Sequence, residues 1–424
     1  MRNQTLTTRA RKRISNFSSL RSILAYGMNP AVGLMTGPVL ARMLGPNGRG
    51  ELAALLQPLT MADSVAALGV PTAIVYFLNR GNPSDRTMKI AYSVVAVSSL
   101  TVYLCLAWYA GILTSDSQLP ESQVLLLWTT VIVGALASCR RAQHAAAANW
   151  AVLDAERATS AILRLTTVLG LAGFGITSST LYATAYLGAG ILAYGVLLYP
   201  TQSSANVERH TVGLSEFLRF AWVSAAAAVA MTASARLDQI MLPISGSMEE
   251  LGYYSVAVTV AEIPMIAAAV GARNILTDAT QGHTTLSALR RATLPILTCA
   301  AASTLGAILA RPAIPVLFGP QFNGAVAPTV VLCIGTIFGG ITAIAVSYLA
   351  GIGRPAWSSV SYASGIALTL LCFGWGWRRI DAVDAAIIAT AAQMVTATTA
   401  ILFMRRAHQQ TLRERTAFGE DAYE

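Results

Sequence analysis

The chain has 424 residues, of which 54% are hydrophobic and 12% charged, and its mean hydropathy is +0.56. A soluble domain carries about 25% charged residues, so this composition excludes a water-soluble globular protein. The net charge of +9 would suit a nucleic-acid-binding protein, but the basic residues are distributed as in a membrane protein, and we expect no nucleic-acid partner.

Long apolar stretches follow one another along the whole chain, with short connections between them. Each is long enough to cross a hydrocarbon core about 30 Å thick, which takes roughly 20 helical residues. The stretches are too long and too continuously apolar for barrel strands. We therefore predict an all-α polytopic membrane protein with about 12 transmembrane helices. The predicted helices are 20–43, 51–78, 88–113, 123–146, 157–177, 179–200, 214–243, 251–278, 287–310, 325–350, 356–377 and 382–404.

The first residues are basic, like the start of a signal peptide, but the apolar run behind them lacks a convincing cleavage site, so we predict a retained first helix. The five cysteines are scattered through apolar runs without CxxC spacing, which favours buried free thiols over a disulfide or a metal site. The four histidines have no metal-ligand spacing either.

The basic residues are concentrated on one side of the predicted membrane. If the N-terminus lies inside, 23 of the 29 lysine and arginine residues fall on the inner side. This asymmetry follows the positive-inside rule and predicts a multi-pass protein of the cytoplasmic membrane with both termini in the cytoplasm. The inner basic residues are expected to contact anionic membrane lipids.

Two segments of equal length suggest an internal repeat. Residues 20–42 and 214–236 are both 23 residues long and end in Ala-Arg, at Arg42 and Arg236. Glycines then stand 19 residues apart in each copy, at Gly50 and Gly69 and at Gly252 and Gly271. Six helices per copy would give both halves the same orientation, related by an axis along the membrane normal. A chance alignment of helices rich in alanine and glycine is the alternative.

The repeat predicts two pseudo-symmetric six-helix bundles, joined by a linker and flanked by terminal tails. The predicted domains are a cytoplasmic basic tail 1–19, an N-terminal bundle 20–200, a cytoplasmic linker 201–213, a C-terminal bundle 214–404 and a cytoplasmic tail 405–424.

Several segments carry a family likeness. The N-terminal half contains PVLARMLGPNGRGELAAL and LGVPTAIVYFL, and the second half contains ARLDQIMLPISGSMEELGYYSVAVTVAEIP, VLFGPQFNGAVAPTVVLCIG and SYLAGIGRP. In their order and spacing these resemble bacterial polysaccharide flippases of the O-antigen (Wzx) type. That family belongs to the multidrug/oligosaccharidyl-lipid/polysaccharide exporter superfamily, which includes multidrug and toxin extruders and lipid II flippases.

The resemblance implies a MATE-like fold, with two six-helix bundles around a central cavity that opens alternately to each side. It also implies transport of an oligosaccharide linked to polyprenyl pyrophosphate, for polysaccharide biosynthesis. Polysaccharide polymerase and glycosyltransferases are expected as partners. A cation-coupled multidrug or small-molecule exporter and a lipid II flippase are the alternatives. The lipid II flippase is the less favoured of these two alternatives. The resemblance to that group implies basic residues deep in the first helix, whereas residues 26–36 carry no charge here. A membrane partner without transport activity is a third class.

Acidic residues within the predicted helices are functional candidates, because a charge at mid-bilayer costs about 2.5–3.5 kcal/mol on insertion scales. Asp63 lies about 20 Å and Glu262 about 16 Å along their helices from the outer face. In the repeat alignment Glu262 matches Thr60, three residues before Asp63, so we predict a pseudo-symmetric acidic pair. These acids, with Asp238, would bind a coupling ion, H⁺ or Na⁺; the alternative is a structural role such as capping a helix or pairing with an arginine.

Three arginines are candidates for contact with the pyrophosphate or an acidic sugar, because guanidinium binds phosphate bidentately. Arg42 and Arg236 are expected near the outer surface, where a helix-anchoring role is the alternative. Arg140 ends a helix on the inner side, where the alternative is that it only follows the positive-inside distribution of basic residues. Gly45, Pro46, Asn47 and Gly48 predict a tight turn after Arg42.

The sequence gives no sign of catalysis. It contains no Walker loop, which disfavours an intrinsic ATP motor. A membrane-embedded glycosyltransferase or polymerase would need a sizeable outer loop with clustered acids, and no extramembrane segment is long enough. We expect a protein that is not an enzyme and has no cofactor apart from the coupling ion.

Overall fold

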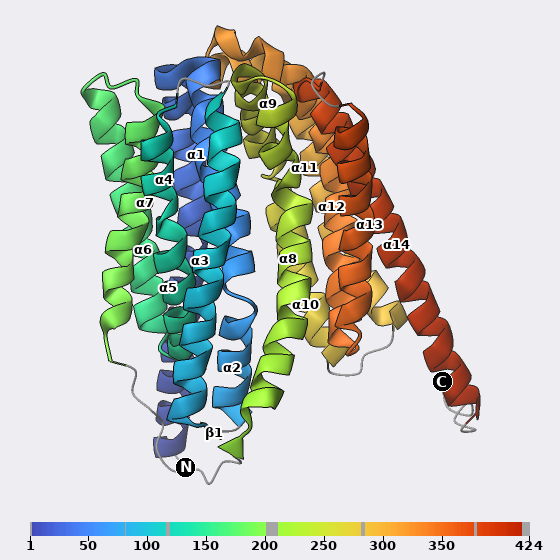
Figure 1. The fold of residues 1–424 in the computed structure, drawn as a ribbon. Coiled ribbons are helices and arrows are strands. Elements are labelled where there is room, and N and C mark those ends of the chain that lie inside the picture. Colours follow the sequence, from blue (N-terminus) through green and yellow to red (C-terminus); the bar gives the residue numbers. More distant parts are fainter. Residues whose placement is uncertain are drawn as a thin grey trace. The chain divides into compact units, whose positions relative to one another are not determined.

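The computed structural model describes the backbone of residues 2–80, 82–115, 119–200, 211–280, 285–376 and 380–417. It describes the side chains of residues 28, 31–80, 83–115, 119–200, 213–280, 291–376, 380–407, 409 and 410. Most of the predicted linker 201–213 lies outside the described residues, as do the side chains of the tail 1–19 and the end of the tail 405–424. The prediction of an all-α polytopic membrane protein is confirmed (Figure 1).

The chain forms two compact units, divided inside two of its helices. The N-terminal unit comprises Met1–Met43 and Ala62–Ala225, and the C-terminal unit comprises Leu44–Met61 and Ala226–Glu424. The segment Leu44–Met61 therefore groups with the second half of the chain, although it follows the first helix in sequence. The domain limits proposed from the sequence stay a prediction.

Helices supply most of both units. The first half of the chain contains α1 (Arg2–Ala66), α2 (Val70–Arg80), α3 (Asp85–Ser115), α4 (Glu121–Trp128), α5 (Thr130–Ala146), α6 (Trp150–Gly173), α7 (Ser179–Tyr194) and the 3-10 turn η1 (Gly195–Leu198). The second half contains α8 (Leu214–Ser245), α9 (Met248–Ala261), α10 (Met265–Thr280), α11 (Thr285–Phe318), η2 (Pro320–Ala325), α12 (Val326–Gly351), α13 (Pro355–Trp375) and α14 (Ala382–Ala417). Two short strands, β1 (Asn82–Pro83) and β2 (Thr211–Val212), pair in parallel.

Each of the twelve predicted apolar stretches falls on one or two of these helices. Within the described residues, eight helices are long and apolar enough to cross a membrane, or ten if each of two bent helix pairs is one span. The predicted count of twelve is compatible with this. The other two predicted helices are 20–43 and 157–177. The first lies partly outside the residues whose side chains the structure describes, and the second lies on α6, which carries four charged side chains: Asp154, Glu156, Arg157 and Arg164.

The turn predicted after Arg42 is a single-residue break. Gly45 has φ 66° and ψ −179°, while helix continues on both sides of it. A positive φ is strained for residues with a Cβ atom and easy for glycine. The helix therefore changes course at Gly45 without needing a longer loop.

A second break separates α1 from α2, where residues 67–69 form a turn and the two helices are bent by 43°. Gly69 has φ 67°, and a Cβ atom there would lie 2.1 Å from the carbonyl oxygen of Ala221 in α8. No other residue type fits both constraints. The corresponding helix of the second repeat is also broken, since α9 and α10 are bent by 53°.

Within the C-terminal unit, α12 is the central helix. It packs against α14, α10 and α11, and to a lesser extent against α9 and α13 (Figure 1). Small residues on α12, including Gly335, Gly339 and Gly340, are buried and allow this close approach. The unit therefore encloses α12 on several sides and holds the helices around it at short distances.

Helix Leu44–Met61 joins this unit through a reciprocal glycine contact. A Cβ atom on Gly50 would lie 1.6 Å from the carbonyl oxygen of Met248, and one on Gly252 would lie 1.9 Å from that of Pro46. Each is the first glycine of its pair in the repeat alignment, Gly50 before Gly69 and Gly252 before Gly271. The two repeats therefore meet here backbone to backbone, with no room for a side chain on either glycine.

Candidate functional site

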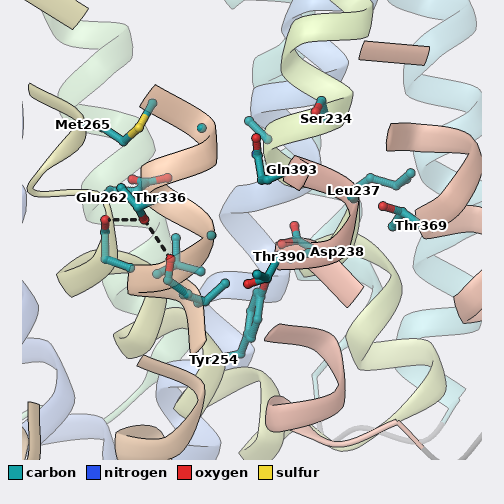
Figure 2. Close-up of a pocket in the computed structure, with 18 residues that line it drawn as sticks. Ser234, Leu237, Asp238, Tyr254, Glu262, Met265, Thr336, Thr369, Thr390 and Gln393 are labelled. Atoms are coloured by element: carbon teal, nitrogen blue, oxygen red, sulfur yellow. Dashed lines mark hydrogen bonds between the residues drawn. The ribbon is translucent and has the colours of Figure 1, made fainter. Parts of the chain in front are cut away.

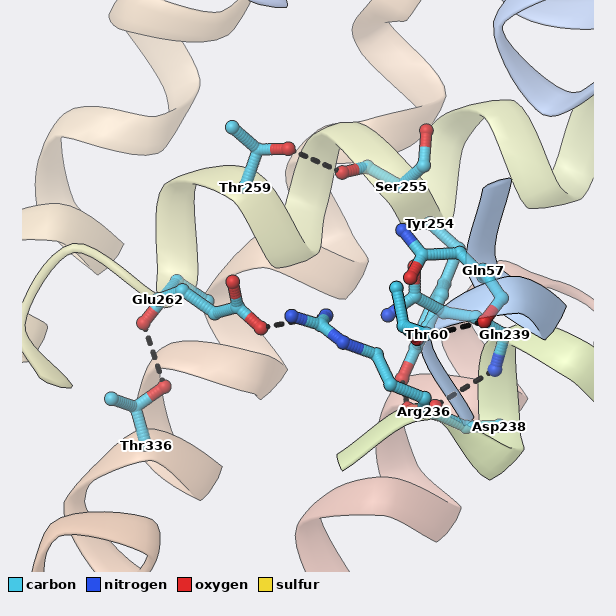
Figure 3. Close-up of polar contacts among 11 residues, drawn as sticks. Gln57, Thr60, Arg236, Asp238, Gln239, Tyr254, Ser255, Thr259, Glu262 and Thr336 are labelled. Atoms are coloured by element: carbon cyan, nitrogen blue, oxygen red, sulfur yellow. Dashed lines mark hydrogen bonds and ion pairs between the residues drawn. The ribbon is translucent and has the colours of Figure 1, made fainter. Parts of the chain in front are cut away.

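An ion pair joins α8 to the end of α9 in the C-terminal unit. Arg236 Nη1 lies 2.9 Å from Glu262 Oε1 (Figure 3). Glu262 caps the C-terminus of α9, and Pro264 follows two residues later. A proline disfavours helical conformation in the residue before it, so α9 ends here and the Glu262 side chain is presented at the bend.

Beside this pair, a carboxylate is held by its own helix and by α9. Asp238 Oδ1 accepts a hydrogen bond of 2.8 Å from the backbone N–H of Gln239. Asp238 Oδ2 accepts a hydrogen bond from the hydroxyl group of Tyr254, whose side chain is fully buried. Figure 3 shows both groups close to Arg236. The site therefore contains two carboxylates and one guanidinium group within membrane-spanning helices.

Asp238 and Glu262 line a common cavity of about 160 Å³ in the C-terminal unit (Figure 2). Its polar lining comes from α8, α9, α12, α13 and α14 and from the bend after α9. The polar groups that matter most are Asp238, Tyr254, Glu262, Thr336, Thr390 and Gln393. Drug-sized ligands occupy pockets of roughly 300–1,000 Å³, so this cavity is too small for an oligosaccharide and large enough for an ion with a few waters.

The threonines of this cavity are fixed by hydrogen bonds to backbone carbonyl groups. Thr336 Oγ1 donates to the carbonyl oxygen of Ala261 at 2.9 Å, and Thr390 Oγ1 donates to that of Val331 at 3.1 Å. Their hydroxyl oxygens keep the capacity to accept further bonds. Carboxylate, hydroxyl and amide oxygens are the ligands that hard cations prefer, so the lining has the composition of a site for a small cation.

Asp63 belongs to the N-terminal unit, near the end of α1. Its carboxylate lies against Gly134 of α5, where an added Cβ atom would lie 2.9 Å from Asp63 Oδ1. Among the described residues, no hydrogen bond or ion pair engages this carboxylate. The role predicted for Asp63 and Glu262 as an acidic pair stays a prediction, and the direct contact of Glu262 is with Arg236.

The candidate arginines have different surroundings. Arg42 is exposed, three positions before the break at Gly45. Arg236 lies inside α8, which continues to Ser245, and its guanidinium group pairs with Glu262 within the C-terminal unit; its predicted place near the outer surface stays a prediction. Arg140 Nη1 donates to Gln143 Oε1 at 2.7 Å, within its own helix.

Sequence reasoning missed Tyr254, Thr390 and Gln393 as parts of the site. All three are polar side chains inside apolar runs. The criterion used for the acidic residues, a position deep within a predicted membrane helix, would have selected them as well. Thr390 and Gln393 stand three residues apart and so share a helix face, which is a further signal in the sequence.

A family model described as "Polysaccharide biosynthesis protein" matches residues 39–327, which is more than half of the chain. No curated protein sequence matches the chain.

Solved structures are similar over almost the whole length. The lipid II flippase MurJ in an inward closed conformation has a TM-score of 0.70 at 10% identity, covering 96% of this chain and 93% of that one. An inward-facing multidrug resistance transporter of the MATE family and MOP superfamily has a TM-score of 0.62 at 12% identity, covering 95% and 100%. A MOP superfamily transporter from Pyrococcus furiosus has a TM-score of 0.52 at 13% identity, covering 92% and 95%.

At these identities the solved structures establish the fold, and the family model establishes the family. Both agree with the likeness to polysaccharide flippases noted in the sequence, which is confirmed. The chain belongs to the polysaccharide biosynthesis protein family and has the fold of the MurJ and MATE proteins of the MOP superfamily.

Proposed function

We propose that the chain flips an oligosaccharide linked to polyprenyl pyrophosphate across the cytoplasmic membrane for polysaccharide biosynthesis. It works by alternating access, with both termini in the cytoplasm. The glycan enters the transport path while the polyprenyl tail stays in lipid. The protein contributes binding and conformational change, with no covalent chemistry.

The observation that carries this proposal is the cavity of the C-terminal unit, which Asp238 and Glu262 both line and where Glu262 pairs with Arg236. Ionisable groups inside membrane helices are costly and mark ion paths and transport sites. A transporter without an ATP motor needs such a site to draw on an ion gradient or the membrane potential. The family match supports a polysaccharide-related cargo in place of an unspecified solute.

In the proposed cycle H⁺ or Na⁺ binds at Asp238 and Glu262, with Asp63 as a further acid in the N-terminal unit. The oxygens of Thr390 and Gln393 complete the coordination in the C-terminal unit. Arg42, Arg140 and Arg236 are the proposed contacts for the pyrophosphate. Anionic lipids contact the basic inner side, and polymerase and glycosyltransferases supply or consume the cargo.

The test is flipping of a fluorescent lipid-linked oligosaccharide in proteoliposomes, with a pH or sodium gradient imposed. Asp238→Asn keeps the size of the side chain and removes the charge that would bind a cation. We expect it to lower gradient-driven flipping by about tenfold or more, equivalent to about 1.4 kcal/mol. Glu216→Gln is the matched control, because Glu216 lies in the first turn of the same helix and is exposed.

The same vesicles separate the other cargoes. Uptake of lipid II with no flipping of a polysaccharide-repeat lipid would assign the chain to lipid II transport. Movement of a cationic dye with neither lipid transported would assign it to multidrug export. If wild type moves none of the three under any gradient, the transport proposal fails.

A further inference from the structure

A second and larger cavity lies in the N-terminal unit. Its volume is about 710 Å³, and it is lined by residues of α2, α5, α6 and the first part of α8. This volume falls within the range of roughly 300–1,000 Å³ that is common for small-molecule sites. None of the six residues predicted from the sequence lines it. Arg141 does, although its neighbour Arg140 was the arginine expected to bind cargo.

The lining is basic. It includes the arginines Arg80, Arg141 and Arg157 and no carboxylate. Two carboxylates behind the lining compensate part of this charge, since Arg141 lies 2.8 Å from Glu156 and Arg157 lies 3.6 Å from Asp154. Within the described residues, these two ion pairs engage Arg141 and Arg157 and leave Arg80 as the lining arginine without a carboxylate at ion-pair distance.

Arg80 carries the uncompensated charge. It is the last residue of α2 and is exposed. Its Nη1 donates to the hydroxyl group of Tyr76 at 2.8 Å, and its guanidinium carbon lies 4.8 Å from the centre of the Tyr76 ring. Within the described part of the chain, no carboxylate pairs with Arg80. A tyrosine thus holds the guanidinium group in place while its remaining N–H donors stay available.

Aromatic rings form the adjoining wall. Tyr76 and Phe220 stack with ring centres 4.4 Å apart and planes at 22°. Trp150, at the start of α6, is 47% exposed and also lines the cavity. A planar or sugar ring attached to a phosphate could pack against these faces while the phosphate meets the arginines.

We propose that this cavity binds a phosphate or pyrophosphate group that carries a ring. A guanidinium fork recognises phosphate oxygens bidentately, and Arg80 offers such a fork at this cavity. Arg141, whose Nε and Nη2 donate to Glu156, and Arg157 add positive groups to the same wall. The arginines lie on the side that the charge distribution assigns to the cytoplasm. Assignment of the phosphate to a polyprenyl carrier rests on the proposed function, whereas binding of the phosphate group itself does not.

The first experiment measures binding of inorganic pyrophosphate to the purified full-length chain in detergent by calorimetry. Arg80→Gln removes the uncompensated charge together with the hydrogen bond and the ring contact to Tyr76; because Arg80 is exposed at the end of α2, the fold should survive. A hydrogen bond to a charged partner is worth about tenfold in affinity or more, and we expect a loss of that size. Arg80→Lys keeps the charge without the fork and should bind with intermediate affinity.

Arg219→Gln is the matched control. Arg219 is exposed, precedes Phe220 in α8 and does not line the cavity. Arg157→Gln is the second test variant, with thermal unfolding recorded for each protein. The proposal is overturned if wild type does not bind pyrophosphate. It is also overturned if Arg80→Gln and folded Arg157→Gln bind like wild type, or if Arg219→Gln weakens binding equally.

A second arm uses nanodiscs with polyprenyl pyrophosphate or with phosphatidylglycerol as the anionic component. Competition of polyprenyl pyrophosphate with inorganic pyrophosphate identifies a carrier lipid as the source of the phosphate. Binding of inorganic pyrophosphate without such competition identifies a soluble phosphate compound. Unchanged oligosaccharide flipping in a variant that has lost pyrophosphate binding would remove the cavity from the transport cycle and leave the proposed function standing. Pyrophosphate binding without any flipping would leave the cavity as a phosphate site and refute the proposed function.

Discussion

The ion pair between Arg236 and Glu262 gives the sharpest prediction. Its atoms lie 2.9 Å apart, and the two side chains are 26% and 50% exposed. Coulomb's law gives about 1.4 kcal/mol at this distance in a water-like dielectric and about 6 kcal/mol at an effective dielectric constant of 20. Because Glu262 is half exposed, solvent screens the pair and the lower Coulomb energy is the relevant one. We expect the pair to contribute about 1 kcal/mol, the upper end for exposed ion pairs.

The prediction is tested with a double-mutant cycle of Arg236→Gln, Glu262→Gln and the combination. Each single variant should lower the unfolding temperature of the purified protein by about 1–3 °C. The double variant should lose less stability than the sum of the two single variants, with a coupling energy of about 1 kcal/mol. Additivity within about 0.3–0.5 kcal/mol would refute the interaction that the geometry implies.

The same variants separate a structural acid from a coupling acid when flipping is measured. If Glu262 only neutralises Arg236, flipping falls in each single variant and recovers in the double variant, where no unpaired charge remains. If Glu262 binds the driving cation, the double variant stays inactive. Recovery of gradient-driven flipping in the double variant would therefore refute the coupling role of Glu262.

Two further predictions concern packing and a buried ion pair. Gly50→Ala places a methyl group 1.6 Å from the carbonyl oxygen of Met248 and should destabilise the protein by about 1–3 kcal/mol, measured as a lower unfolding temperature. Gly111→Ala is the control and should be neutral, because no atom lies within 4 Å of the added methyl group. Arg141→Gln leaves Glu156, 5% exposed, without its ion-pair partner and should cost about 2 kcal/mol, below the 3–5 kcal/mol of a fully buried pair because Arg141 is 34% exposed. Equal unfolding temperatures for the two glycine variants, or an unchanged one for Arg141→Gln, would contradict these packing and pairing arguments.

The helices could be predicted from the sequence because lipid imposes a simple rule. An apolar run of about 20 residues must form a helix to satisfy its backbone. The rule does not locate breaks inside a run. Leu68 and Gly69 have positive φ within a stretch that reads as one apolar helix, 51–78, and the break depends on the close approach of Ala221 from a distant helix.

The site could be predicted in part for a similar reason. Charge inside an apolar run selected Asp238 and Glu262, and both line the same cavity. The partner of Glu262 could not be predicted, because Arg236 lies 26 positions away on another helix and its apparent place at a helix end suggested the membrane surface. Arg140 and Arg141 are adjacent in sequence, and only the packing of α5 against α6 shows that Arg141 is the one facing Glu156 and the larger cavity.

The strength of the Arg236–Glu262 pair bears on how an ion could drive the proposed cycle. A cation that binds Glu262 must displace Arg236, and an ion shifts a conformational equilibrium only by its difference in affinity for the two states. A fully buried ion pair, worth several kcal/mol, would resist displacement of the arginine by a cation. A carboxylate without a partner would bind the cation with no arginine in competition for it. A half-exposed pair of about 1 kcal/mol corresponds to roughly a fivefold change in equilibrium, which lies at the lower end of the typical range of coupling between sites. Arg236 therefore fits the role of an internal competitor for the ion, released toward an anionic group whenever the cation occupies Glu262.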